Sequence, residues 1–175
     1  AYLARQGYAA GTRVVATMIA AADASTRRAL QLAEGDLVVD IRRLRLADGT
    51  PFSLDHARFA ADRFPGMLEQ PLGGSLYRLI GEEYGVVIGD AEEVIEVVNA
   101  TDDEAALLAV EVGAPLVSIT RTAFDASGTP FEFSHDLFRS DRMRITMRTP
   151  GRGLRGAPGD GTPHFATISP LPVVG

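Results

Sequence analysis

The chain has 175 residues, of which 46% are hydrophobic and 23% are charged, and this composition excludes a disordered chain and is typical of one globular domain. Cysteine is absent, which excludes disulfides, thiolate catalysis and cysteine-based zinc sites. The formal net charge is −6, and lysine and arginine do not form a cluster, so a duplex-DNA-binding surface is excluded. The sequence contains no apolar run of about 18 residues, so it does not predict a membrane span.

The first part of the chain predicts a strand, a short helix and a hairpin. The expected elements are a strand over 14–19, a helix, and hairpin strands over 37–46 and 52–59. Asp23 or Ser25 can cap the helix, and we expect Gly35 to end it. Asp48 and Gly49 supply the turn of the hairpin.

A second helix is expected in the middle of the chain, over residues 75–84. Ser75 can cap it. Leu76, Leu79 and Ile80 have the spacing of a stripe that faces a core.

The second part of the chain repeats the order of the first. The expected elements are strands over 94–98, 115–124, 130–138 and 143–148, and a helix over 105–110. Thr101 and Glu104 have the spacing of a capping box, and Gly113 is expected to end the helix. From residue 150 onward, glycine and proline predict a tail without a core of its own, although residues 165–168 can pack on the domain.

An internal repeat connects the two parts. The segment 49–52 recurs as 128–131, and His56 is in step with His135. A chance match of two similar hairpins is the alternative. The repeat predicts an α+β fold, with an antiparallel sheet of about six strands, helices on one face and a pseudo-twofold axis. A cleft between the halves is the expected ligand site.

Arg43 and Arg45 are the first candidate binding residues. They lie two apart on a predicted strand, so their side chains share a face. Two neighbouring guanidinium groups repel each other and favour an anion between them, and guanidinium binds carboxylate or phosphate bidentately. The alternative is a solvated face with ordinary surface arginines.

Acidic and hydroxyl side chains form a second candidate group. Glu132, Ser134 and Asp136 share one face of a predicted strand, and Ser53 and Asp55 occupy the related strand of the first half. Such groups can bind sugar hydroxyls or an amino group. The alternatives are internal pairing with arginines and a glycosidase carboxylate pair, although the sequence does not define the separation that a glycosidase needs.

The three histidines give no metal-binding pattern. His56, His135 and His164 lack the spacing of a zinc motif, and we interpret the first two as structural or surface residues. No metal is proposed. Gly11 and Thr12 precede a strand and can offer backbone N–H groups to an anion, although a plain loop is the alternative.

Several segments resemble one known family. The segment 42–51, RRLRLADGTP, is similar to the "RLRLAdgeP" segment of UTRA domains, and 64–66 and 75–77 resemble their "FPG" and "SLY" elements. The segments 128–134 and 139–142 resemble "G-x-P-[IV]-E-x-s" and "yRgDR". UTRA domains are the effector-binding halves of GntR-family regulators of the HutC subfamily and share a fold with chorismate lyase. The resemblance covers about residues 3–148, in order.

The resemblance implies an anion clamp from Arg43 and Arg45, with Ser75 at a helix N-terminus. It also implies that Glu132 and Asp55 recognise polar groups of the ligand. The further candidate site residues are Tyr77 and Phe138, at positions of the family pattern, together with Gly11 and Thr12 from the strand start above. Two positions depart from the family pattern. Phe138 replaces a tyrosine, which removes a hydroxyl contact, and Ser140 replaces a glycine.

These observations together predict a UTRA effector-binding domain over residues 1–149 and a tail over 150–175. The domain is expected to bind a small anionic metabolite, a sugar phosphate or an organic acid, without cofactor or catalytic residue. DNA binding is expected only through a missing N-terminal winged helix-turn-helix domain of a longer regulator. We expect a cytoplasmic homodimer without membrane contact. The alternative is a chorismate-lyase-like enzyme that uses the same pocket.

Overall fold

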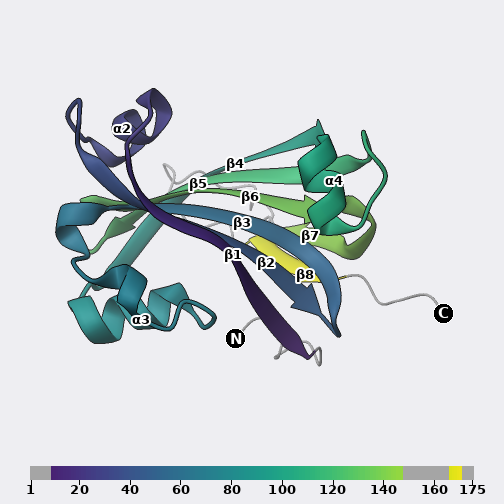
Figure 1. Cartoon of the computed structure of the whole chain (residues 1–175), viewed down its shortest axis with the longest axis horizontal. Coiled ribbons are helices and arrows are strands. Elements are labelled where there is room, and N and C mark those ends of the chain that lie inside the picture. Colours follow the sequence, from purple (N-terminus) through teal and green to yellow (C-terminus); the bar gives the residue numbers. More distant parts are fainter. Residues whose placement is uncertain (1–8, 148–165, 171–175) are drawn as a thin grey trace, which may run out of the picture.

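The computed structural model describes residues 9–147 and 166–170. Six strands form one antiparallel sheet in the order β1-β2-β3-β6-β5-β4, and β7 and β8 form a second sheet of two strands (Figure 1). Helices α2, α3 and α4 pack on the larger sheet. The expected α+β fold with an antiparallel sheet of about six strands is confirmed. Among the described residues, no helix is long and apolar enough to cross a membrane.

The bounds of the elements follow the chain order. The first half contains β1 (Ala10–Ala21), α2 (Ala24–Leu30), β2 (Leu37–Ala47), β3 (Thr50–Ala60) and the 3-10 helix η1 (Ala61–Arg63). Between the halves lie η2 (Met67–Glu69) and α3 (Leu76–Tyr84). The second half contains β4 (Ile88–Asn99), α4 (Asp102–Leu108), β5 (Pro115–Asp125), β6 (Pro130–Arg139) and η3 (Ser140–Arg142), followed by β7 (Met143–Met147) and β8 (Ala166–Pro170).

The internal repeat is visible in the element bounds. β4, α4 and β5 begin at residues 88, 102 and 115, where β1, α2 and β2 begin at 10, 24 and 37, so the offset is 78 throughout. The hairpin turns add one residue, which brings His56 into equivalence with His135. These two histidines are also directly paired between β3 and β6. The pseudo-twofold axis therefore passes between them, at the centre of the sheet.

The helices cover both faces of the sheet, so the prediction of helices on one face is wrong for α3. Leu30 of α2 packs on Val38, and α4 packs near Leu44, on the face of the even-numbered residues of β2. Leu76 and Ile80 of α3 instead pack on the odd-numbered face, against Val39. Both faces of β2 carry apolar residues at this end, so both need to be covered.

The starts of α2 and α4 were predicted correctly and their ends were not, whereas α3 ends at Tyr84 as expected. Thr101 and Glu104 form the expected capping box at the start of α4, and Asp23 caps α2. The helices end at Gln31 and Ala109, each with a left-handed backbone, whereas Gly35 and Gly113 lie in the turns before the next strands. A glycine after a predicted helix indicates that a residue in that region has a positive φ, but it does not show which residue ends the helix.

The chain after β6 forms a second, smaller sheet. Residues 143–147 form β7, as expected, and β7 pairs with β8, so that Ile145 lies opposite Ile168. Part of the predicted tail is therefore a strand. Residues 1–8, 148–165 and 171–175 lie outside the described residues, and they include His164 and most of the predicted tail.

Candidate ligand-binding site

A cleft of about 740 Å³ opens on the sheet face that carries α3. Both halves of the repeat contribute to it, together with the loop before α3. The lining residues are Ala10, Thr12, Arg43, Arg45, Gly73, Gly74, Ser75, Leu76, Tyr77, Glu93, Arg121, Glu132, Ser134 and Asp136. The cleft lies where the repeat predicts a ligand site.

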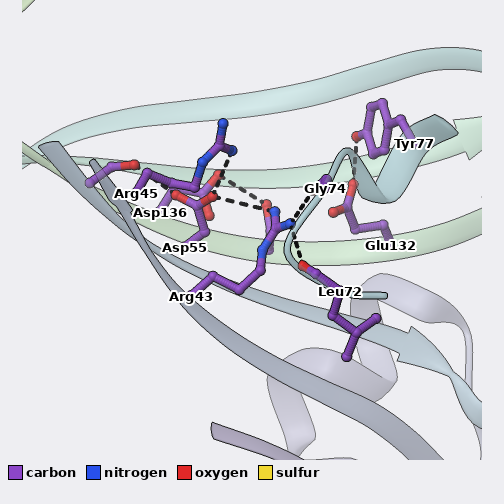
Figure 2. Close-up of polar contacts among 10 residues, drawn as sticks. Arg43, Arg45, Asp55, Leu72, Gly74, Tyr77, Glu132 and Asp136 are labelled. Atoms are coloured by element: carbon purple, nitrogen blue, oxygen red, sulfur yellow. Dashed lines mark hydrogen bonds and ion pairs between the residues drawn. The ribbon is translucent and has the colours of Figure 1, made fainter. Parts of the chain in front are cut away.

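Arg43 is a buried arginine that holds the loop in front of α3. Its side chain is only 8% exposed. Its Nη1 donates hydrogen bonds to the backbone carbonyl oxygens of Leu72, at 3.3 Å, and Gly74, at 2.9 Å (Figure 2). Burial lowers the pKa of Arg43, while the neighbouring Asp55 opposes this change. The guanidinium therefore has a structural role in addition to its place on the cleft.

Asp55 lies between the two predicted anion-binding arginines. Its Oδ2 is 3.5 Å from Nη2 of Arg43 and 3.4 Å from Nη1 of Arg45 (Figure 2). Ser53 Oγ donates to the other oxygen, Oδ1, at 2.8 Å. A carboxylate of the protein itself thus occupies the position between two guanidinium groups that the sequence predicts for an anion. The Nε atoms of Arg43 and Arg45 are buried and have no hydrogen-bond partner within the described part of the chain.

A chain of hydrogen bonds connects α3 to the second half. Tyr77 OH donates to Oε2 of Glu132, and Arg121 Nε donates to Tyr77 OH at 2.9 Å. Arg121 also forms an ion pair with Glu93 on β4. Burial raises the pKa of Tyr77, and the adjacent Glu132 raises it further. Burial likewise raises the pKa of Glu132, against the hydrogen bond from Tyr77 and the charge of Arg121.

The acidic row on β6 faces the cleft, as expected from its alternation. Glu132, Ser134 and Asp136 all line it. Ser134 Oγ donates to Oδ2 of Asp136 at 3.5 Å. Burial raises the pKa of Asp136 well above its usual range, and the charges of Asp55 and Glu132 raise it further.

The structure brings together most of the residues predicted for the site. The predicted residues on the cleft are Thr12, Arg43, Arg45, Ser75, Tyr77 and Glu132. Asp55 contacts both arginines but does not itself line the cleft. Phe138 packs edge-on against Phe52, with ring centroids 5.7 Å apart, and does not line the cleft. Gly11 does not line it either, and is paired with Leu46 in the sheet.

Arg121 and Glu93 are cleft residues that the sequence analysis did not propose as ligand contacts. Arg121 is the repeat equivalent of Arg43 at the offset of 78 residues, because β5 begins at 115 where β2 begins at 37. The repeat therefore carried a signal that could have placed Arg121 on the cleft. Glu93 lies on an edge strand without a motif, and only the register of β4 against β5 places it opposite Arg121.

The histidines lie on the other face of the sheet, in polar contacts within the protein. His56 Nε2 is 2.8 Å from Asp40, and Arg58 Nη2 lies 3.1 Å from its Nδ1. His135 Nε2 is 2.8 Å from Ser118 Oγ. Burial lowers the pKa of both histidines. These contacts agree with a structural role. The described residues contain no group of three or more metal-ligating side chains.

Comparison with known proteins places this geometry in a family. The model of the family described as "UTRA domain" matches residues 5–144. The transcriptional repressor NagR of Bacillus subtilis is 30% identical over 102 residues, which are 58% of this chain and 42% of NagR. The transcriptional repressor PhnF of Mycolicibacterium smegmatis is 29% identical over 142 residues, which are 81% of this chain and 58% of PhnF. The chain spans about half the length of the curated relatives it matches.

Solved structures agree with this result. The effector domain of PhnF from Mycobacterium smegmatis has a TM-score of 0.76 and 28% identity, and the match covers 80% of this chain and 86% of that domain. The ligand-binding domain of a regulator from Bordetella bronchiseptica that is assigned to the GntR family has a TM-score of 0.71 and 31% identity, with 75% and 83% covered.

These relatives are transcriptional repressors and effector domains of regulators, and they identify this chain as an effector-binding domain of the GntR regulator type with a chorismate-lyase-like fold, and not as an enzyme. The chain belongs to the UTRA domain family.

Proposed function

We propose that the cleft binds a small anionic metabolite, a sugar phosphate or an organic acid, as the effector of a transcriptional regulator. The observation that carries this proposal is the convergence of three guanidinium groups, those of Arg43, Arg45 and Arg121, on one cleft. Guanidinium binds carboxylate and phosphate bidentately. Burial raises the pKa values of Glu132 and Asp136 on the same cleft, so these acids oppose an anion less than exposed carboxylates would.

Neutral and polar groups complete the proposed site. The nine-residue helix α3 begins beside the cleft, after its cap Ser75, and a helix N-terminus favours negative charge. Glu132 and Ser134 offer hydrogen-bonding groups at alternate positions of β6 for hydroxyl groups of the ligand. In this arrangement Glu132 selects among ligands and does not act as a general acid.

Effector occupancy is proposed to modulate DNA binding by an N-terminal winged helix-turn-helix domain of the full-length regulator, in the cytoplasm. Ala10 and Thr12 of β1 line the cleft, and the backbone N–H of Ala9 donates to Oδ1 of Asp48 at 2.7 Å. A ligand in the cleft would therefore contact the start of β1, on the N-terminal side of the domain. Coupling free energies between two such sites are typically about 1–3 kcal/mol.

A homodimer is part of the proposal. β1 and β4 are the two edges of the sheet. Both carry exposed apolar side chains, among them Met18 and Ile19 on β1 and Val94 and Val97 on β4. Exposed edges and apolar patches favour association. A monomer in light scattering at high micromolar concentration would count against dimerisation through this domain.

The anion site is tested by thermal unfolding in the presence of sugar phosphates and organic acids, followed by calorimetry. A ligand that binds only the folded state raises the melting temperature. Arg45→Ala should remove the shift, whereas Arg28→Ala, at an exposed position of α2, should retain it. An equal response of both variants would contradict the proposed site.

A further inference from the structure

Two carboxyl groups face each other across the centre of the sheet beside the cleft. Asp55 on β3 and Asp136 on β6 are direct partners in the antiparallel register. Side chains of directly opposite residues lie on the same face and close together. Figure 2 shows both carboxyl groups on the same side of the sheet, next to the guanidinium of Arg45.

The two carboxyl groups differ in their hydrogen-bond partners. Asp55 receives bonds from Ser53, Arg43 and Arg45. Asp136 receives one long bond from Ser134 at Oδ2, and its Oδ1 is buried without a partner among the described residues. Burying a charged carboxylate oxygen without a hydrogen-bond donor costs much free energy, whereas burying a protonated, neutral carboxyl costs much less. The geometry therefore favours a proton on Asp136 and a negative charge on Asp55.

The surrounding charges agree with this distribution. The charged and titratable groups that line the cleft with Asp136 are Arg43 and Arg45 on β2, Tyr77 on α3, Glu93 on β4, Arg121 on β5 and Glu132 on β6. Burial raises the pKa of Asp136 well above its usual range, and the charges of Asp55 and Glu132 raise it further. The backbone N–H of His56 and the charge of Arg43 act in the opposite direction.

We propose that Asp55 and Asp136 form a proton-holding carboxyl pair that couples anion binding in the cleft to proton uptake. In the empty cleft the pair holds one proton, and the carboxylate of Asp55 forms ion pairs with both arginines. An anion that reaches Arg43 and Arg45 competes with Asp55 for the same guanidinium groups. The displaced carboxylate then faces the anion and takes a second proton from solvent, because two adjacent negative charges repel each other.

This inference rests on the proposed function, since it requires an anion in the cleft. It adds that Asp55 is the internal competitor of the effector and not only a contact for it. It also adds a direction: anion affinity falls as the pH rises, by at most about tenfold per pH unit for the uptake of one proton.

Sulfate is a suitable probe because it remains a dianion between pH 5.5 and 8.5, so that any proton taken up belongs to the protein. Calorimetric titration in buffers of different ionisation enthalpy measures the number of protons taken up per sulfate. For the unaltered chain we expect net uptake and an affinity that decreases with pH. Asp55→Asn should bind sulfate several-fold more tightly, without uptake, because the amide does not compete for the arginines.

Two further variants separate the parts of the inference. Asp136→Asn carries a permanently neutral side chain, like the protonated Asp136 of the unaltered chain, so this variant should bind sulfate with the same proton uptake. Asp141→Asn, an exposed carboxyl on η3, controls for a general loss of negative charge and should behave like the unaltered chain. Thermal unfolding of each variant establishes that it is folded.

The possible failures are distinguishable. If the unaltered chain does not bind sulfate, the anion site of the proposed function is wrong and this inference fails with it. If sulfate binds without proton uptake, or if Asp55→Asn weakens binding, the anion site stands and the carboxyl pair is refuted. Loss of uptake in Asp136→Asn would place the exchanged proton on Asp136 and would refute its assignment to Asp55.

Discussion

Arg43 and Arg121 occupy equivalent positions in the two halves of the sheet, and each holds one part of the segment that ends in α3. Arg43 binds the carbonyl oxygens of Leu72 and Gly74. Arg121 binds the hydroxyl of Tyr77, the second residue of the helix. This segment has no counterpart in the repeat, so the two equivalent arginines bind different partners in it. The cleft is asymmetric for this reason, although the sheet beneath it has approximate twofold symmetry.

Arg43 and Arg45 should separate into a structural and a ligand-binding role. Arg43→Ala removes two hydrogen bonds to the loop, one of them buried, and one partner of Asp55, so we expect the free energy of unfolding to fall by about 2–4 kcal/mol. Arg45, with a side chain that is 26% exposed, should cost at most about 1 kcal/mol on truncation but weaken anion binding. Urea unfolding and calorimetry of the two single variants measure both quantities. Equal losses of stability would contradict this division.

The hydrogen bond from Tyr77 to Glu132 should contribute to stability through the cost of leaving the acid unpaired. Glu132 is 6% exposed, and Tyr77→Phe removes its hydroxyl partner. We expect a loss of about 1–3 kcal/mol in the free energy of unfolding. Tyr84→Phe is the matched control, since the Tyr84 hydroxyl bonds the carbonyl oxygen of Pro65 at an exposed position. The control should lose clearly less in the same urea titration, and a loss as large as that of Tyr77→Phe would refute the argument.

Much of the fold was predictable from local signals, because caps and turns depend on a few neighbouring residues. Thr101 with Glu104 and Ser75 mark two helix starts correctly. The side on which α3 packs was not predictable, since β2 has apolar residues on both faces. A helix stripe shows which side of the helix is buried and does not show which face of the sheet covers it.

The ion pairs of the site were less predictable than its side chains. The position of Arg43 and Arg45 on one face follows from the alternation of a strand. Their bridge to Asp55 depends on the pairing of Arg43 with Asp55, and the bulge after Arg45 shifts the register beyond it. A bulge adds a residue to one strand, and a single sequence does not locate it. The carboxyl pair likewise depends on the β3–β6 register, which joins residues far apart in the chain.

Asp136 should make the domain less stable at high pH. Its pKa in the folded chain is raised, so its contribution is complete below the unfolded pKa and is lost as the pH rises through the folded one. Asp136→Asn does not ionise and should therefore become more stable relative to the unaltered chain as the pH rises from 4 to 8. Asp141, whose pKa is lowered by Arg139, has the opposite sign: the cost of Asp141→Asn should shrink as the pH falls. Urea unfolding at several pH values measures both trends, and parallel profiles for the two variants would refute the assignment.

The domain alone should not bind DNA in a sequence-specific way, because the groups that such binding requires are absent or already engaged. The chain carries a net charge of −6, and binding to a duplex depends on cations that release counterions from phosphates. Arg43, Arg45 and Arg121 line the cleft. Within the described residues, the three α-helices have 7, 9 and 7 residues and pack on the sheet, so none is free to enter a major groove as a recognition helix does.

The test compares this chain with the full-length regulator on its operator at fixed salt, with and without effector. We expect a shift only with the full-length protein, and a change of its operator affinity of about 5–150-fold when effector is added. A sequence-specific shift by this chain alone would show that the domain reads DNA itself. An operator affinity that effector leaves unchanged would show that the cleft does not communicate with the DNA-binding part.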